Sequence, residues 1–186
     1  MIDNPGYVYL KGTGIFKCGE QFLDLSKLTG DVGLSTNLLK NIEIIKLDVS
    51  RIITIENLTS FHTYTPQNEL VIYLGGYHNK LIRSFLKMLH EFNPHLIFYH
   101  WGDLDLGGFR ILHHLRSQTG VPFKPLYMDL NTLKYYEDYA MPINKEHEKQ
   151  LIELLGKEEY QEFRDVIQYM VDKKIRLEQE IVGFDK

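Results

Sequence analysis

Three short runs of β-branched and aromatic residues constrain the fold of this chain more than any other feature. They occupy residues 52–56 (IITIE), 70–74 (LVIYL) and 96–101 (LIFYHW). None of the three alternates strictly between apolar and polar residues, which is typical of strands that are covered on both faces of a sheet. The sequence therefore predicts three central parallel strands.

The segment between the second and third runs has the pattern of a helix. In residues 79–92 (NKLIRSFLKMLHEF), apolar side chains recur at helical spacing and charged ones fall on the other side. The apolar face is predicted to hold Leu81, Phe85, Met88 and Phe92. A helix that connects two parallel strands makes a βαβ unit, so the pattern favours an open α/β sheet.

A second helix and a fourth strand are predicted after the third run. Residues 106–117 place Phe109, Leu112 and Leu115 on one face, and Gly120 is expected to end the helix. Residues 123–129 (FKPLYMD) follow as a strand, and Pro125 favours a place at the sheet edge. The predicted fold class is α/β, with a central, mostly parallel sheet of about four strands flanked by helices.

Three segments are expected along the chain. Residues 1–50 form an N-terminal hairpin and connecting segment, in which residues 8–25 are interpreted as an amphipathic hairpin and residues 42–49 (IEIIKLDV) as a short strand or a helix end. Residues 51–140 form the core, and residues 141–186 form a helical C-terminal appendage packed on it. The appendage has apolar residues at helical intervals: Leu151, Leu154, Leu155, Tyr160, Phe163, Ile167 and Met170.

Composition narrows the classes of protein to which the chain can belong. With 21 Lys and Arg against 25 Asp and Glu, the net charge is −4, so a polyanion would need a local basic patch. Cys18 is the single cysteine, which excludes an internal disulfide and a cysteine-based zinc cluster. The chain shows no membrane-spanning run and no signal peptide, and we expect a cytoplasmic location without membrane contact.

Acidic residues follow the predicted strands at the edge where open α/β sheets bind their ligands. Glu56 ends the first run, Asp103 and Asp105 follow the third, and Asp129 ends the fourth strand. Because parallel strands present their carboxyl ends at one edge, the sequence predicts a functional site there.

The pair Asp103 and Asp105 predicts a site for a hard divalent cation. In extended chain, positions i and i+2 point to the same side, and two like charges so close together need a cation or hydrogen-bond donors between them. Carboxylate ligands favour Mg²⁺ or Mn²⁺. Gly107 and Gly108 open the following helix, whose N-terminal N–H groups can receive a phosphate.

Glu56 is expected to be the third acid, either as a metal ligand or as a general base. Two of the acids have an alternative interpretation, in which they cap helices and bind no metal. Asp105 can cap the helix that follows it, and Asp129 can cap a helix beginning at residue 130. Eight histidines are present, and His100, His113 and His114 lie near the aspartate pair, but a zinc site is not expected because no paired histidine motif occurs.

Further residues are candidates for the same site. Glu178 and Glu180 are possible additional acids, although on a continuous helix they would face different directions, so one of them is expected near the metal. Arg110 and His114 share an outward stripe of the second helix, and Lys80 opens the first. These three are candidate phosphate contacts, with a solvated surface as the alternative.

The motifs TIENLTSF, VIYLGG and HWGDLDLGG together resemble a Toprim domain, the Mg²⁺-dependent catalytic fold of topoisomerases, primases and several nucleases. The blocks ENLTSF, WGDLDLGGFRIL, YMDLNTL and RLEQE are similar to the C-terminal part of the JetD family of Wadjet defence-system nuclease subunits, over about residues 30–182. This family is related to the topoisomerase VI A subunit.

The resemblance implies a DNA-cleaving domain in which Glu56 takes the acid/base role and Asp103 and Asp105 hold Mg²⁺. It also implies double-stranded DNA as substrate, an SMC-type ATPase complex as partner in defence against plasmids, and a homodimer as the form that cuts both strands. Family members usually carry a winged-helix or arm region ahead of this part. Here only about fifty residues precede Glu56, so the chain is either a fragment or a reduced relative.

The sequence is also compatible with two other functions. One is a catalytically silent module that binds DNA or a partner protein with the same surface. The other is an aspartyl phosphotransferase or phosphatase of the haloacid dehalogenase type, which also uses two aspartates at a strand end. That class has Thr or Val two residues after the second aspartate, where this chain has Gly107, so it ranks third.

Overall fold

The computed structural model describes residues 6–76 and 79–183. The chain divides into two compact units. Unit 1 contains the chain up to residue 100 together with residues 115–124, and unit 2 contains residues 101–114 and the chain from residue 125 onward. The structure is a mixed α/β fold, as the sequence predicts.

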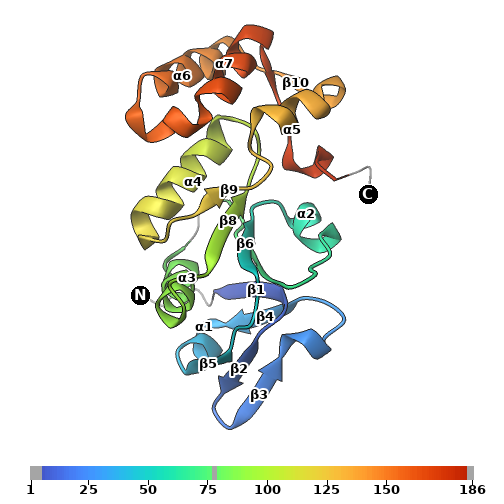
Figure 1. Ribbon diagram of the computed structural model, residues 1–186, viewed down its shortest axis with the longest axis vertical. Helices are drawn as coiled ribbons and strands as arrows, with labels where there is room; N and C mark the ends of the chain where they lie inside the picture. Colours follow the sequence, from blue (N-terminus) through green and yellow to red (C-terminus); the bar gives the residue numbers. More distant parts are fainter. Residues whose placement is uncertain (1–5, 77–78, 184–186) are drawn as a thin grey trace. The chain divides into compact units, whose positions relative to one another are not determined.

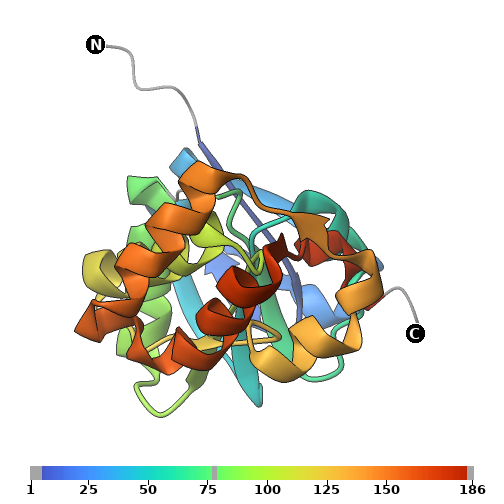
Figure 2. The ribbon, with the colours of Figure 1, turned by 90° about the horizontal axis from the view of Figure 1, so that it is seen from above.

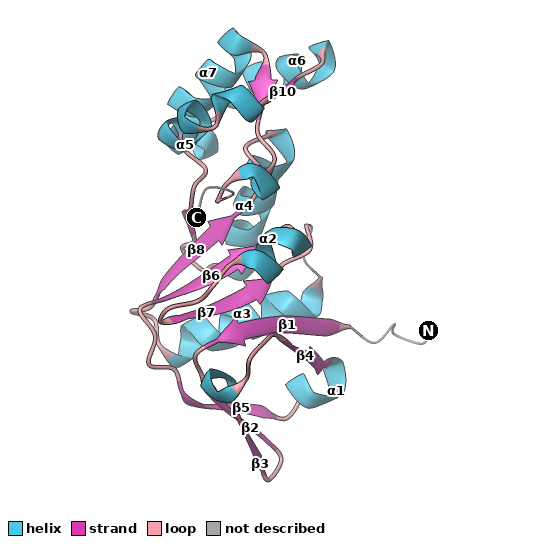
Figure 3. Ribbon diagram, turned by 90° about the vertical axis from the view of Figure 1, so that its right-hand side faces the viewer, coloured by secondary structure: helices cyan, strands magenta, loops and turns pink. Residues whose placement is uncertain are grey.

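The main sheet has six strands in the order β4-β1-β7-β6-β8-β9 (Figures 1 and 3). Strands β6 and β7 are parallel, with Arg51 opposite Glu69 and Ile55 opposite Tyr73, whereas β1 is antiparallel to both β4 and β7. The strands are β1 (Tyr7–Gly12), β4 (Val32–Ser35), β6 (Arg51–Ile55), β7 (Glu69–Tyr73), β8 (Ile97–Trp101) and β9 (Lys124–Pro125). The three runs predicted as central strands are therefore β6, β7 and β8.

The N-terminal segment contributes more to the sheet than the sequence indicated. The expected sheet of about four strands is too small, because β1 and β4 extend it beyond β7. The predicted hairpin of residues 8–25 is only partly correct. Strands β2 (Ile15–Cys18) and β3 (Gln21–Asp24) pair as a hairpin, while β1 belongs to the main sheet. Residues 42–49 contain a strand, β5 (Ile42–Lys46), which pairs with β2.

Two helices lie on opposite faces of the main sheet (Figures 1 and 3). Helix α2 (Leu58–Thr63) packs on β7 through Phe61 and Tyr73, whose rings are 5.7 Å apart. Helix α3 (Lys80–Phe92) is the predicted crossover helix. Unit 1 also contains α1 (Thr36–Leu39) and the 3-10 turn η1 (Leu25–Lys27).

The predicted buried face of α3 is displaced by about one residue. Leu81 and Met88 are half-buried and Phe92 is 46% exposed. The buried side chains are Ile82, Phe85, Leu86 and Leu89. The sequence places two apolar residues side by side in each turn, so the periodicity alone does not decide which of them faces the core.

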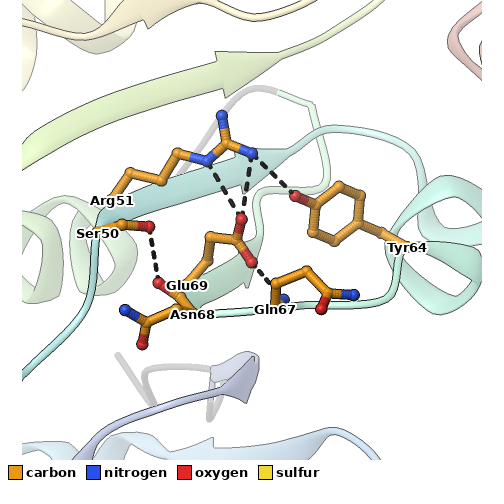
Figure 4. Close-up of polar contacts among 6 residues, drawn as sticks. All are labelled: Ser50, Arg51, Tyr64, Gln67, Asn68 and Glu69. Atoms are coloured by element: carbon orange, nitrogen blue, oxygen red, sulfur yellow. Dashed lines mark hydrogen bonds and ion pairs between the residues drawn. The ribbon is translucent and has the colours of Figure 1, made fainter.

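A partly buried ion pair links the starts of β6 and β7 (Figure 4). Arg51 Nη2 donates to Glu69 Oε1 at 3.1 Å, and the side chain of Glu69 is only 6% exposed. The second carboxylate oxygen of Glu69 accepts from the backbone N–H of Gln67 at 2.6 Å. Because both oxygens are bonded, this carboxylate fixes the register of the two parallel strands.

Helix α4 (Leu106–Thr119) follows the aspartate pair, as predicted. Phe109, Leu112 and Leu115 are fully buried, and Gly120 ends the helix with a φ of +71°. The fourth predicted strand is much shorter than expected. Strand β9 covers only Lys124–Pro125, at the sheet edge that Pro125 favours, and does not reach Asp129.

Unit 2 is mostly helical. Helices α6 and α7 lie side by side (Figures 1 and 2), and the ring of Phe109 on α4 packs 4.8 Å from Phe163. Its elements after β9 are α5 (Leu130–Tyr135), η2 (Glu137–Tyr139), β10 (Met141–Pro142), α6 (Lys145–Leu155), η3 (Glu158–Phe163), α7 (Arg164–Lys173), β11 (Ile175–Arg176) and η4 (Gln179–Ile181). Within residues 6–76 and 79–183, none of the helices has the length and apolar character needed to cross a bilayer.

Candidate metal centre

The turn that carries Asp103 and Asp105 is closed by a glycine. A Cβ atom on Gly108 would lie 2.1 Å from the carbonyl oxygen of Asp103, so the first turn of α4 reaches this backbone only because residue 108 has no side chain. The N–H of Gly108 donates to Asp105 Oδ1 at 2.8 Å. Asp105 therefore caps α4, which is the role without metal that the sequence left open.

Asp103 is held by the chain near its C-terminus. The N–H of Gln179 donates to Asp103 Oδ1 at 2.6 Å. Next to it, Leu104 and Leu177 exchange two backbone hydrogen bonds of 2.9 and 3.1 Å, and both side chains are buried. The turn and residues 177–179 thus pair like two short antiparallel strands, which fixes the first aspartate.

The environment of Asp103 disfavours its negative charge. The pKa of Asp103 is raised to about 6, mainly by burial and also by the negative charges of Asp105 and Glu178. The hydrogen bond from Gln179 and the positive charge of Arg176 lower the pKa but do not cancel the rise. A shift of this kind is frequent in sites that bind a cation or move a proton.

Arg176 completes a cluster with Asp103, Asp105 and Glu178, which we call the acidic cluster. Its Nη1 atom lies 3.9 Å from Asp105 Oδ2 and donates a hydrogen bond to Glu178 Oε1. Sequence reasoning used the segment RLEQE for its two glutamates and missed Arg176 and the backbone of Gln179. The signal was available, because both residues lie in the same five-residue motif.

The two C-terminal glutamates have different positions. Helix α7 ends at Lys173, Lys174 is left-handed with a φ of +59°, and the chain then runs as β11. Glu178 has extended backbone and lies in the acidic cluster, whereas Glu180 lies on η4 and is exposed. The chain is therefore not a continuous helix here, and Glu178 is the glutamate that pairs with Arg176.

Glu56 lies in unit 1, directly after β6. Its Oε2 atom is 3.9 Å from Nε2 of His100, a residue on β8 that is completely buried. The other ring nitrogen of His100 lies 3.0 Å from Thr54 Oγ1, which fixes the ring. The fixed imidazole therefore lies beside the carboxylate of Glu56.

Two of the remaining candidates, Asp129 and Arg110, make structural contacts. Asp129 is exposed and caps α5, because its Oδ1 atom accepts from Thr132 N–H at 2.8 Å. Arg110 is half-buried, and its Nη1 atom donates to Gln150 Oε1 on α6 at 3.4 Å. Lys80 is exposed at the first position of α3, and His114 is half-buried. Gly107 is half-buried at the start of α4.

The donor set fits a hard divalent cation. Among the residues that the structure describes, no group of three or more His, Cys, Asp or Glu side chains is arranged to hold a metal ion. Mg²⁺ often binds through one or two carboxylates and completes its shell with water and substrate phosphate, so Asp103 and Asp105 supply the kind of ligands it needs. The raised pKa of Asp103 is a second sign of fit, since a cation there would relieve the repulsion among the carboxylates.

Comparison with known proteins identifies the family. The family model described as "Wadjet protein JetD, C-terminal" matches residues 20–186. The Wadjet protein JetD of Bacillus cereus (strain Q1) is 30% identical over 186 residues, an alignment that covers 98% of this chain and 46% of that protein. The chain thus spans about half the length of this curated relative. The chain belongs to the family of Wadjet JetD C-terminal domains.

Proposed function

We propose that this domain is a Toprim-type nuclease domain that cleaves double-stranded DNA with the help of Mg²⁺ or Mn²⁺. The observation that carries the proposal is the position of Asp103. Its carboxyl group is half-buried beside two other acids, its pKa is raised, and the chain holds it with a dedicated backbone hydrogen bond. An arrangement of this kind costs stability, and a cation explains why the domain keeps it.

Asp103 and Asp105 would hold the metal through oxygen ligands. When bound there, Mg²⁺ or Mn²⁺ supplies positive charge that polarises the phosphate to be cleaved and favours an attacking hydroxide. Glu178 is the additional acid of the same cluster. Asp105 uses one carboxylate oxygen to cap α4 and can present the other as a ligand.

Glu56 is assigned the acid/base role that the family resemblance implies. It accepts a proton from the water that attacks the phosphate, and the fixed ring of His100 lies beside its carboxylate. The position of Glu56 directly after the parallel strand β6 supports this assignment, because ligand sites of open α/β sheets lie at the carboxyl ends of their strands. Lys80, Arg110 and His114 stay as proposed phosphate contacts.

The partners are also proposed from the family. The matched relative is named as a Wadjet protein, and we propose that this domain acts with the other Wadjet components, an SMC-type ATPase complex among them, as a homodimer. A net charge of −4 supports delivery of DNA by these partners, because the chain as a whole does not attract a polyanion.

Plasmid cleavage by the assembled complex tests the proposal. Glu56→Gln and Asp103→Asn are expected to lower cleavage in the presence of Mn²⁺ by at least about a hundredfold, because each removes a group used in the chemical step. Glu180→Gln is the matched control, since it changes an exposed acid two residues from Glu178 and is expected to leave cleavage unchanged. Wild-type rates in both site variants would contradict the proposal and favour the catalytically silent binding module.

A further inference from the structure

The guanidinium of Arg176 lies where positive charge is most needed in the acidic cluster. It pairs with both Asp105 and Glu178, and its side chain is only 22% exposed. Its Nη2 atom also lies 3.9 Å from the sulfur of Met141. Among the described residues, the ion pairs of Asp105 and of Glu178 are all with Arg176.

The backbone around Arg176 is fixed by strand pairing, whereas its guanidinium is held by side-chain contacts alone. Arg176 pairs with Met141 between β11 and β10, and Leu177 is bound to Leu104 by two hydrogen bonds. The guanidinium itself ends a long, flexible side chain and is held by the two carboxylates and the weak contact with Met141. It can therefore leave without unfolding the segment that presents Glu178.

The backbone of Glu178 is fixed as well. The neighbouring residues Leu177 and Gln179 are fixed by hydrogen bonds to Leu104 and Asp103, so the backbone of Glu178 stays beside the aspartate turn. If the guanidinium leaves, Asp105 and Glu178 lose the ion-pair partner that they share, and the repulsion among the acids of the cluster is no longer offset, which favours uptake of another cation.

We propose that Arg176 is a positioning residue that takes the place of the divalent cation between Asp105 and Glu178 in the metal-free domain, and that the metal binds by displacing its guanidinium. This inference rests on the proposed function, because it concerns the same metal site. It assigns to Arg176 two effects: it stabilises the metal-free acids and it weakens metal binding. Glu178 becomes available to the metal only after the exchange.

If Arg176 competes with the metal, removal of its guanidinium should strengthen Mn²⁺ binding. Removal of an ion pair with a purely structural role should not. In Arg176→Gln, Mn²⁺ affinity is expected to rise about five- to tenfold, since the metal no longer competes with a partly buried ion pair. The metal-free variant is expected to unfold at a lower temperature than the wild type, and saturating Mn²⁺ should remove most of that difference.

Calorimetric titration with Mn²⁺ alone tests the proposed exchange. Thermal unfolding of the same samples shows whether each variant is folded. The variants are Arg176→Gln and Arg176→Lys, and the control is Lys174→Gln, which removes a nearby exposed cation that pairs with Glu148. Arg176→Lys is expected to bind Mn²⁺ with intermediate affinity, because lysine keeps the charge but loses the planar fork. Lys174→Gln should bind as the wild type does.

The outcomes separate this inference from the proposed function. Mn²⁺ binding to the wild type with equal or weaker binding to Arg176→Gln would overturn the role of Arg176 and leave the metal site in place. No binding to the wild type or to any variant would overturn the metal site and this inference with it. If Arg176→Gln does not fold, Arg176→Lys decides the question: tighter binding than the wild type supports the exchange, and unchanged binding contradicts it.

Discussion

At the scale of single residues, Asp103 combines a favourable hydrogen bond with an unfavourable charge. Its Oδ1 atom accepts from Gln179 N–H, a contact that an amide oxygen can also make. Its negative charge is opposed by burial and by the neighbouring acids. The side chain is therefore better explained by ligand binding than by stability of the metal-free domain.

Asp103→Asn is expected to make the metal-free domain more stable. The substitution keeps the hydrogen bond from Gln179 and removes the charge, so the free energy of unfolding at pH 7 should rise by about 1–3 kcal/mol, in line with a pKa raised from 3.8 to about 6. Urea unfolding of the two proteins measures this difference. A variant that is less stable than the wild type would show that the charge itself stabilises the turn.

The raised pKa of Asp103 also predicts how the stability difference between the wild type and Asp103→Asn depends on pH. A carboxyl group whose pKa is raised in the folded state binds its proton more tightly there than in the unfolded chain, so its destabilising effect is present above about pH 6. As the pH falls through 6 toward 4, the folded wild type takes up that proton and the stability gap to Asp103→Asn should close. Unfolding measured between pH 4 and 7.5 checks this, and a gap that does not change with pH would contradict the raised pKa.

At the scale of elements, the turn between β8 and α4 depends on Gly108. In Gly108→Ala, the new methyl group would meet the backbone of Asp103, which cannot move away easily, so we expect a loss of about 2–3 kcal/mol in the free energy of unfolding. Gly107→Ala is the matched control. Its methyl group would lie 3.1 Å from Oδ1 of Asp105, a contact that a movement of a few tenths of an ångström relieves, and alanine favours the helix.

Thermal unfolding distinguishes the two glycine variants. Gly107→Ala should unfold within a few degrees of the wild type, while Gly108→Ala should unfold well below it. Equal unfolding temperatures would mean that α4 does not approach the aspartate turn as closely as the structure indicates.

The elements also show what the sequence could and could not predict. Strands β6, β7 and β8 were predicted within one residue at each end, because buried parallel strands consist of continuous β-branched runs. Strand β1 was assigned to the wrong partner, since its pairing with β7 joins residues about sixty positions apart and leaves no local signal. Strand β11 was missed because the left-handed Lys174 that ends α7 is not a glycine.

The candidate site likewise contains residues that the sequence could place and residues that it could not. The positions of Glu56 and of the aspartate pair after strands follow from the sequence, since ligand sites of α/β sheets lie at the carboxyl ends of strands. The contacts of Arg176 and Gln179 do not follow from it, because they join residues more than seventy positions apart along the chain. Glu178 could be nominated from the family motif but not distinguished from Glu180, since that requires knowing where α7 ends.

At the scale of the whole molecule, the described chain has two compact units that contain different proposed functional groups. Glu56 and His100 belong to unit 1, and the acidic cluster with Arg176 belongs to unit 2. Membership of the JetD family is shown by sequence, and the chain covers 46% of the curated relative that it matches. The activity and partners of the assembled system therefore remain proposals, and the metal site can be tested on this chain directly.

Calorimetric titration of Mn²⁺ into the wild-type chain, Asp103→Asn and Glu180→Gln tests the central claim most directly. The account predicts binding to the wild type and to Glu180→Gln, with release of protons near pH 6 as Asp103 gives up its proton, and no measurable binding to Asp103→Asn. Thermal unfolding of each sample shows that all three are folded. Equal Mn²⁺ binding to the wild type and to Asp103→Asn would contradict the assignment of the acidic cluster as the metal site.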